Sequence, residues 1–588
     1  MGNYNWNSYD EVIDNLSFNW YLNDYWTVKG QFSVTKKYSK SEKFIDPLSS
    51  KTSVTGSKDN NLAGDLYTTN GESLDWNSNA FLYYTRSFNK QHNLNVSAGW
   101  EAASGTTEST NAHYRGFPSG EFHSLNYAAE VYKKPTRTEN TTRRVSVLAS
   151  ANYTWNDIYL VDASVRFDGS SEFGANQKWA PFFSGGLGVN IHNYDFFKSN
   201  GYINKLKLRA SYGRTGKVNF PAYAATTMYE TLFDEWYITG YGAVLKALGN
   251  KDLTWEKTDK LSVGIETKTF HDRLTVDFEY YYNKTIDLVN DVTLSQTSGF
   301  STYKDNMGQV ANKGVELKLR ADIYRDRNWD VALWGNMAHN KNEILKISDS
   351  QKAYNERVAA YYKNEALYQE TLGLSHGAEY SVPLPQYEEG ASLTSIWAVR
   401  SLGIDPTTGK EIFLNRDGSI ADKWNAAQEV VVGNTEPKCS GAFGLNLSYK
   451  NWTLFASFLY EWGGQEYNQT LVNNVENADL VNKNVDLRVL TDRWKKPGDI
   501  AQFKDIKDRG MTTLPTSRFV QDKALVRLNS LNVSYDFNRD WIKKHLRMNL
   551  LRLEASTSDL INWSSIKQER GLSYPRSWKV EFSLKAQF

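Results

Sequence analysis

Residues 576–588, at the carboxy-terminal end, read RSWKVEFSLKAQF and alternate between apolar and polar side chains from Trp578 onward. One face would carry the apolar side chains of Trp578, Val580, Phe582, Leu584, Ala586 and Phe588. The other face would carry Lys579, Glu581, Ser583, Lys585 and Gln587. Alternation with a period of two predicts a strand that has one apolar and one polar surface. Such a strand either covers the core of a soluble sandwich or separates lipid from a wet interior.

The composition is compatible with both alternatives. The mean hydropathy is −0.59, and no segment approaches the roughly 20 apolar residues of a transmembrane helix. Aromatic residues make up 14% of the chain, with 19 Trp and 36 Tyr. This content is typical of membrane barrels, whose aromatic girdles mark both interfaces, and also of large secreted β proteins.

Net charge, cysteine content and the first residues exclude several classes. The net charge of +1 argues against a basic nucleic-acid-binding surface. The single cysteine, Cys439, excludes a disulfide framework and any multi-cysteine metal site. The opening residues, MGNYNWNSYDEV, have neither the basic nor the apolar region of a signal peptide. We therefore expect either a cytoplasmic protein or a true start that lies upstream.

Short polar turns and long connections follow one another along the chain. The turns lie at 23–24, 89–91, 156–157, 271–273, 325–327 and 450–451. The long connections are expected near 36–75, 103–142, 216–258, 341–439 and 463–521, with shorter ones near 170–178, 285–311 and 557–575. This alternation is the pattern of an outer-membrane barrel with short periplasmic turns and long extracellular loops. A soluble sandwich has no reason to place every long loop at one end.

The predicted strands keep their charges on one face. In 157–169, Val161 and Val165 oppose Asp162 and Arg166. A charge that faces lipid costs about 2–4 kcal/mol at the bilayer midplane, so the charged face must point into the barrel. We expect an all-β, antiparallel transmembrane barrel of about 17 strands over residues 1–588. Counting back from the terminal strand indicates that the first strand, near 12–22, descends from the outside. The N-terminus would then lie outside the cell, whereas single-chain barrels begin on the periplasmic side, so we expect the front of the barrel to be missing.

Several stretches together resemble the SusC/RagA group of TonB-dependent outer-membrane transporters. They run in family order along nearly the whole chain, so they are specific as a set. They are ASVRFDGSSEFG (163–174), KWAPFFSGGLGVNI (178–191), KLKLRASYGRTG (205–216), NKDLTWEKTDKLSVGIE (250–266), FEYYYNKTIDLV (278–289), GFSTYKDNMGQVANKGVELKL (299–319), SLGIDPTTGKEIF (401–413), VVGNTEPKCSGAFGLNLSYKNWTLFASF (431–458) and SRFVQDKALVRLNSLNVSYDF (517–537).

The resemblance implies a plugged barrel of the roughly 22-stranded class in the Gram-negative outer membrane. It implies a SusD-like surface lipoprotein as partner, the TonB complex as energy source, and oligomeric glycans or peptides as cargo. A terminal strand that carries Phe582 and ends in Phe588 resembles the signal read by the barrel assembly machinery. The family's plug, TonB-contacting segment and signal peptide are not in this sequence, so we expect this chain alone to be unable to drive active transport.

The sequence offers no catalytic motif, no cofactor motif and no metal site. DGSSEFG at 168–174 lacks the GK[ST] ending of a phosphate-binding loop and is predicted to be a tight turn. NRDGS at 415–419 is similar to a calcium loop, but Phe413 stands where the first ligand should be. The eight histidines show no HExxH spacing, and no GxSxG elbow occurs. The protein is therefore not expected to be an enzyme.

Aromatic residues in the long loops are the candidate ligand-binding residues. They are Trp236, Tyr237, Tyr241, Tyr361, Tyr362 and Trp397. Exposed rings could stack on sugars or contact a partner protein, whereas the alternative is that they pack within their own loops. The alternative to the transporter as a whole is a soluble or surface-attached β protein that binds glycans as an adhesin. Extraction by detergent rather than release by high salt would separate the two.

Overall fold

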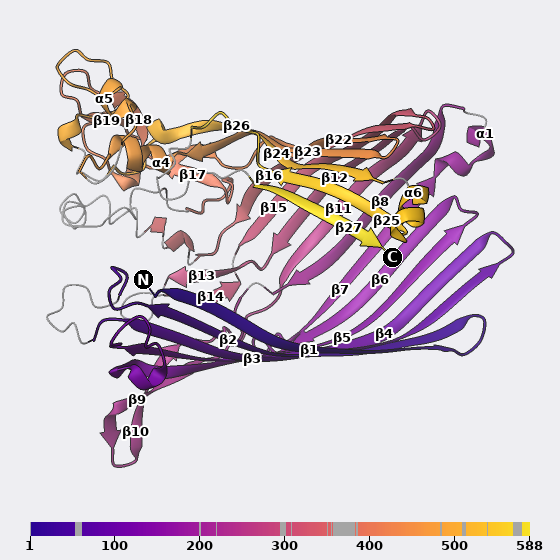
Figure 1. Cartoon of the computed structure of the whole chain (residues 1–588), viewed down its shortest axis with the longest axis horizontal. Helices are drawn as coiled ribbons and strands as arrows, with labels where there is room; N and C mark the ends of the chain where they lie inside the picture. Colours follow the sequence, from indigo (N-terminus) through magenta and orange to yellow (C-terminus); the bar gives the residue numbers. More distant parts are fainter. Residues whose placement is uncertain are drawn as a thin grey trace. The chain divides into compact units, whose positions relative to one another are not determined.

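The computed structural model describes the chain except for residues 1, 53–61, 199–200, 219, 294–301, 307, 350, 354, 357–382, 384–385, 482–484, 509–512, 538, 568–578 and 588. Eighteen of the described strands form one large sheet (Figure 1). The chain divides into two compact units. The first unit consists of Met1–Gly186, Gly213–Lys257 and Val289–Asn306, and the second of Leu187–Tyr212, Thr258–Leu288 and Met307–Phe588.

The first unit is an antiparallel meander. Its strands are β1 (Tyr4–Tyr21), β2 (Trp26–Ile45), β3 (Asp65–Phe88), β4 (His92–Arg115), β5 (Glu130–Trp155) and β6 (Tyr159–Ser170). Each strand pairs with the next one along the chain. Successive connections therefore alternate between a turn end, with short turns such as 89–91, and a loop end, with longer connections such as 46–64.

The second unit repeats this arrangement. Its strands are β12 (Leu274–Ile286), β15 (Gln309–Arg325), β16 (Trp329–Lys346), β22 (Cys439–Tyr449), β23 (Trp452–Tyr467), β24 (Val520–Asp536), β25 (Leu550–Ser558) and β27 (Lys579–Gln587). They pair antiparallel in this order, and β26 (Asn562–Ser564) pairs with the first part of β24. The residues of β7 (Trp179–Asn190), β8 (Ile203–Lys217) and β11 (Glu256–Thr269) are divided between the two units.

Smaller elements occupy the connections. The short strands are β9 (Met228–Tyr237), β10 (Gly240–Ala247), β13 (Val289–Thr293), β14 (Thr302–Asn306), β17 (Ser395–Ala398), β18 (Arg400–Ile404), β19 (Glu411–Leu414), β20 (Ile420–Ala421) and β21 (Val430–Asn434). The helical segments are η2 (Leu125–Tyr127), η3 (Ile191–Asn193), α1 (Asp195–Lys198), η6 (Ala426–Gln428), α4 (Gln469–Leu471), η7 (Val472–Glu476), α5 (Arg488–Thr491), η8 (Ile506–Asp508), η9 (Ser517–Phe519) and α6 (Arg539–Leu546). In the described part of the chain, no helix has the length and apolarity that crossing a membrane requires.

The strands of the first unit extend further than the alternation predicts. Much of the predicted connections 36–75 and 103–142 is strand, since β2 continues to Ile45 and β4 to Arg115. Apart from a few aromatic and apolar residues such as Phe44, these strand ends are polar on both faces, so the period of two is largely lost from their sequence. Cross-strand polar pairs stabilise them instead. The hydroxyls of Thr106 and Thr141, for example, lie 3.2 Å apart.

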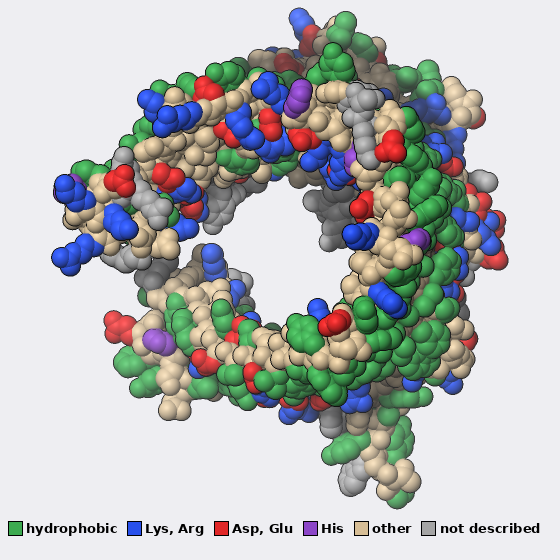
Figure 2. Space-filling model, turned by 90° about the vertical axis from the view of Figure 1, so that its right-hand side faces the viewer, with side chains coloured by type: hydrophobic (Ala, Val, Ile, Leu, Met, Phe, Trp, Pro, Cys, Tyr) green, Lys and Arg blue, Asp and Glu red, His purple; other side chains and the backbone are tan. Residues whose placement is uncertain are grey.

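The register places apolar and polar side chains on opposite faces of the sheet. Val147 on β5 lies opposite Phe167 on β6, and both rank among the exposed large hydrophobic residues. Ser146 lies opposite Asp168 on the other, polar face. Figure 2 shows hydrophobic side chains gathered over much of the outer surface at its right-hand side. The strands therefore leave their apolar face uncovered, as the sequence predicts for a face that contacts lipid.

Buried apolar clusters lie at the loop end of the strands. Phe44, Leu66 and Phe117 form one cluster where β2, β3 and β4 meet their long connections. Val310 and Ile344 belong to another, at the loop end of β15 and β16. Each cluster packs a connection against the strands that it joins. These loops therefore have a defined structure that is supported by the sheet.

Aromatic rings mark the turn end in each unit. In the first unit, the rings of Trp155 and Tyr159 stack at 5.3 Å across the turn between β5 and β6. In the second unit, Trp452 and Tyr535 lie 4.8 Å apart at the ends of β23 and β24. We call these rings the turn-end aromatic band. Trp and Tyr are favoured at the level where lipid tails meet headgroups, because one part of each ring system is apolar and the other polar.

A charge placed on the apolar face tests whether this face contacts lipid. Val165 lies in the middle of β6 and is 59% exposed, so arginine would fit there without a clash. We expect Val165→Arg to lower the free energy of unfolding in lipid vesicles by about 2–4 kcal/mol. Ser164→Arg, on the polar face of the same strand, should have a much smaller effect. Denaturant titration followed by tryptophan fluorescence measures both, and equal effects would contradict a lipid-facing sheet.

Candidate functional site

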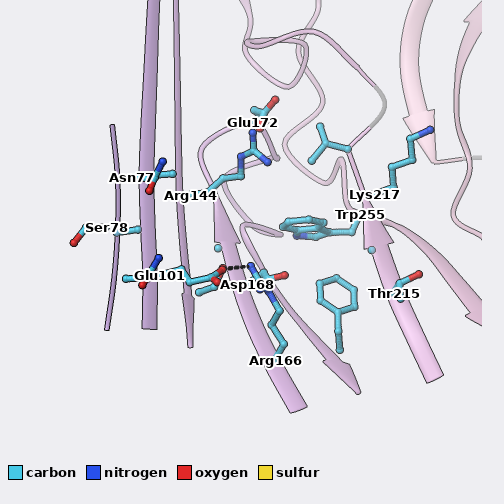
Figure 3. Close-up of a pocket in the computed structure, with 18 of the residues that line it drawn as sticks. Asn77, Ser78, Glu101, Arg144, Arg166, Asp168, Glu172, Thr215, Lys217 and Trp255 are labelled. Atoms are coloured by element: carbon cyan, nitrogen blue, oxygen red, sulfur yellow. Dashed lines mark hydrogen bonds and ion pairs between the residues drawn. The ribbon is translucent and has the colours of Figure 1, made fainter. Parts of the chain in front are cut away.

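A pocket of ≈ 920 Å³ opens on the polar face of the first unit (Figure 3). Its residues come from β3 to β8 and from the connection that precedes β11. The charged and aromatic residues in its lining are Glu101, Arg144, Arg166, Asp168, Glu172, Phe182, Lys217, Phe220 and Trp255. The pocket therefore combines both signs of charge with an aromatic wall near the loop end of the unit.

Arg166 on β6 is held by two carboxylates. Its Nη2 lies 2.9 Å from the Glu101 carboxylate on β4, and its Nε lies 2.6 Å from that of Asp168. The same guanidinium donates a hydrogen bond of 2.8 Å to Ser146 Oγ on β5. These contacts join three strands and neutralise the arginine within the pocket wall.

Two other cations in the pocket are exposed. Arg144 lies on the polar face of β5, two residues before Ser146, and Lys217 ends β8. Within the described residues neither has an ion-pair partner, whereas the nearby Glu172 accepts a hydrogen bond from Ser170 Oγ at 3.2 Å. Arg144 is therefore available to donate hydrogen bonds to a ligand that enters the pocket.

Trp255 forms the aromatic wall. Its ring stacks on Phe173 at a centroid distance of 4.2 Å and meets Phe182 edge-on at 5.4 Å. Figure 3 shows the Trp255 side chain extending toward Arg144 and Asp168. The residue is 6% exposed, and its Nε1 is buried without an acceptor among the described atoms. A buried donor of this kind normally has a partner, so a ligand or water oxygen would be stabilised there.

The polar face of the second unit carries a similar charge arrangement. Arg209 on β8 reaches across β11 to β12, where Nη2 lies 2.9 Å from Asp277 and 2.6 Å from Glu279. The side chain passes over Gly264 on β11, and a Cβ at that position would come within 2.8 Å of Arg209 Nε. A side chain at position 264 would therefore push the Arg209 guanidinium aside. A neighbouring pocket of ≈ 530 Å³ is lined by Ser211, Lys260, Ser262, Glu279, Tyr281, Asn283, Asn312, Glu316 and Asn340.

Two long connections of the second unit pack together into what we call the loop module, residues 395–434 and 468–519. Its apolar core contains Val472, Val475 and Phe519. Arg518 bridges the two connections, with Nη2 at 2.9 Å from Glu411 and 2.7 Å from Glu476. All three side chains are nearly buried. Burial acts to lower the pKa of Arg518, but the two carboxylates raise it above its ordinary value.

Glu429 is the buried carboxyl at the edge of the loop module. It accepts a hydrogen bond from Gln386 Nε2, while Arg416 Nε donates to its backbone oxygen at 3.0 Å. Burial raises the pKa of Glu429 to about 7, although the Gln386 hydrogen bond and the Arg416 charge act in the opposite direction. This carboxyl therefore titrates near neutral pH.

The aromatic residues singled out from the sequence are not brought together. Tyr237 and Tyr241 lie on the β9–β10 hairpin and are both 61% exposed. Trp236 pairs with Tyr241 through the backbone, but its side chain lies outside the described part. Tyr361, Tyr362 and Phe588 also lie outside the described residues. Phe582 is exposed on the apolar face of β27. Ligand binding by the loop rings and recognition of Phe582 and Phe588 by the assembly machinery stay predictions.

Trp397 differs from the expectation of an exposed ring. It lies on β17 and is only 2% exposed, because the two long connections fold over each other there. Val399, two residues later, receives a hydrogen bond of 2.9 Å from the backbone amide of Ser517. The ring thus packs inside the loop module, which is the alternative considered for the loop aromatics.

The pocket residues Arg144, Arg166, Lys217 and Trp255 were not predicted as a site. A signal was present, since Asp168, Gly169 and Glu172 of the DGSSEFG stretch line the pocket. The sequence shows that these residues share a face or a turn, but not that six strands bring them together. Among the described residues, no group of three or more His, Cys, Asp or Glu could hold a metal ion. In the 415–419 turn, the Asp417 carboxylate accepts a 2.7 Å hydrogen bond from Ser419 Oγ.

Comparison with known proteins gives one family. A family model described as TonB dependent receptor-like, beta-barrel, matches residues 1–550. TonB-dependent receptor P39 of Formosa agariphila is 26% identical over 566 residues, which cover 87% of this chain and 53% of that protein. TonB-dependent receptor SusC of Bacteroides thetaiotaomicron is 30% identical over 255 residues, 41% of this chain and 25% of that protein. The chain spans about half the length of the Formosa agariphila relatives.

Solved structures show the same fold. The RagAB peptide transporter structure superposes with a TM-score of 0.78 at 22% identity, and the match covers 96% of this chain and 59% of that chain. The RagAB peptide importer in its open-open state gives a TM-score of 0.78 at 21% identity. At this level of identity the likeness concerns the fold alone.

Removing the charge of Arg518 should loosen the loop module. Arg518→Met leaves Glu411 and Glu476 buried without their ion-pair partner, and breaking a buried pair costs about 3–5 kcal/mol. We expect faster amide hydrogen exchange in 395–434 and 468–519, with unchanged exchange in β3 to β5. The triple variant Arg518→Met/Glu411→Gln/Glu476→Gln should recover much of the protection. Unchanged exchange in the single variant would contradict a stabilising role for the triad.

The raised pKa of Glu429 predicts a pH dependence. Between its ordinary pKa of 4.5 and about 7, the folded module keeps a proton that the unfolded chain releases, so the stability of the module falls as pH rises through this range. We expect protease cleavage within 395–434 to increase from pH 5 to pH 8. Glu429→Gln should abolish the increase, whereas Glu388→Gln, on the exposed side of the same connection, should not. A pH profile that Glu429→Gln leaves unchanged would assign the effect to another group.

Proposed function

Because this chain belongs to the TonB dependent receptor-like β-barrel family, we propose that it forms the barrel portion of an outer-membrane transporter for an oligomeric nutrient. The transporter would take a glycan or peptide oligomer through the polar interior of the barrel. Energy would come from TonB through a plug domain belonging to the complete protein. The chain itself would supply the wall and the loop module.

The observation that carries this proposal is the opposite character of the two faces of the sheet. Exposed Val147, Val165 and Phe167 suit lipid, while the polar face holds charged pairs and the pocket around Arg144. A soluble adhesin would expose the same apolar face to water, which favours aggregation. A polar, charged wall is the surface that a hydrated oligomer can pass.

The loop end suits a surface partner. The loop module has an apolar core of its own, and the β9–β10 hairpin exposes Tyr237 and Tyr241. We propose that a SusD-like lipoprotein covers this end and that the pocket on the first unit takes part of the cargo beneath it. Arg144 and Trp255 would donate hydrogen bonds to oxygen atoms of the cargo, and Glu172 would accept them from hydroxyl or amide groups.

Uptake by the complete protein in its native cells tests this function. Deletion of the gene should abolish growth on either an oligosaccharide hydrolysate or a casein peptide mixture as limiting nutrient. Arg144→Gln should raise the concentration for half-maximal uptake by roughly tenfold or more, since a hydrogen bond to a charged group contributes about 1.5–3 kcal/mol. Arg143→Gln, one residue away on the opposite face, is the matched control. Growth of the deletion strain on both nutrients, or release of the protein by high salt without detergent, would contradict the proposal.

A further inference from the structure

The helix α6 has two distinct sides. It forms part of the connection between β24 and β25 at the turn end of the second unit (Figure 1). Ile542 is 0% exposed, and α6 packs against β25 on this side. Trp541 is 51% exposed and stacks on His545 at 5.2 Å. The helix is thus fixed by one apolar side chain and presents a large aromatic ring beside it.

The free side of α6 is basic. Lys543 and Lys544 lie in its last turn, and Arg547 follows the helix. All three side chains are exposed, and none of them has an ion-pair partner among the residues that the structure describes. The acidic residue of the helix, Asp540, lies in the first turn.

The connection that contains α6 follows directly, along the chain, from rings of the turn-end aromatic band. Trp452 lies 4.8 Å from Tyr535, and Tyr535 meets Phe537 edge-on at 5.1 Å. Phe537 directly follows β24 and leads into the connection that contains α6. Trp329 and Tyr449, whose ring centroids lie 4.2 Å apart at the turn end of β16 and β22, also belong to this band. Aromatic rings at this level mark the boundary between lipid tails and headgroups, so residues just beyond them lie among the headgroups.

We propose that α6 binds the phosphate headgroup of an anionic phospholipid in the leaflet at the turn end of the barrel. Lys543, Lys544 and Arg547 contact the phosphate, and Trp541 lies at the level of the glycerol backbone. A short helix with exposed lysines and a tryptophan fits an interfacial position. The proposal rests on the proposed membrane function, because the leaflet is present only if the barrel inserts.

Stabilisation of the helix alone, or binding of a soluble acidic protein, would give different results. Lysines near a helix C-terminus stabilise the helix dipole, and this role would require no lipid and would affect only the folding of α6. A soluble acidic protein would contact the same side chains, and its binding would not depend on the lipid composition. Dependence on an anionic lipid therefore distinguishes the proposed role from both.

Native mass spectrometry of the complete, detergent-solubilised protein titrated with dioctanoyl phosphatidylglycerol measures this binding. The double variant Lys543→Gln/Lys544→Gln should weaken the tightest binding about thirtyfold, since each basic residue near an anionic surface contributes about a factor of five. Trp541→Ala should weaken it further, and Trp541→Phe should restore part of the loss. Phosphatidylcholine should bind weakly to every variant.

The matched control is Lys495→Gln/Lys496→Gln, an adjacent exposed pair in the loop module. This control removes the same charge and should leave phosphatidylglycerol binding unchanged. Equal affinity in the wild type and the Lys543→Gln/Lys544→Gln variant would overturn the proposal. Displacement of the lipid by an equimolar amount of inorganic phosphate would also overturn it, because the site would then recognise the free ion.

Outer-membrane fractionation of the same strains distinguishes a failure of lipid binding from a failure of the proposed function. If the wild-type protein is absent from the outer membrane, the proposed function fails together with this inference. If the wild type and both double variants insert equally, and lipid affinity depends on Lys543 and Lys544, the inference is supported. If all of them insert and lipid affinity does not depend on these residues, only the inference fails.

Discussion

The backbone hydrogen bonds between neighbouring strands are the interaction on which the rest of this structure depends. Strands that leave their apolar face exposed cannot rely on a core between two layers, so each strand is fixed by its partners along its whole length. In lipid this pairing is obligatory, because no water is available to bind an unpaired amide or carbonyl. The pairing also sets the chemistry, because a slip of one residue would move Arg166 and Glu101 to the apolar face.

The way in which side chains are buried differs between the loop end and the turn end of the strands. At the loop end, Phe44 and Val472 belong to small apolar clusters that give the connections a structure of their own. The Arg518 triad adds a buried charge arrangement that is favourable only while both carboxylates and the guanidinium are present. At the turn end most of the connections are short, with those that contain α1 and α6 as exceptions, and aromatic pairs lie at the strand ends. The two ends of the same strands therefore use different physical means of holding their connections in place.

The fold was predictable from the sequence where alternation is strong. The centre of β6 and the terminal strand β27 have the period of two that a half-exposed strand requires, and the resemblance to the SusC/RagA group is confirmed. The ends of β2 and β4 were missed, because their sequences are largely polar on both faces and lose the period of two. The pocket was missed for another reason. Arg144 and Trp255 are 111 positions apart in the sequence, and only the order and stagger of the intervening strands bring them together.

Gly264 has a consequence for how this protein can change over generations. Arg209 reaches its two carboxylates by passing over a strand that carries no side chain at the crossing point. A side chain added at Gly264 would push the guanidinium aside and weaken its contacts with Asp277 and Glu279. Substitution at Gly264 is therefore expected to be easier once Arg209 or the carboxylates have changed. The residues that these three strands carry at the crossing therefore constrain one another during evolution, and Gly264 influences the order in which they can be substituted.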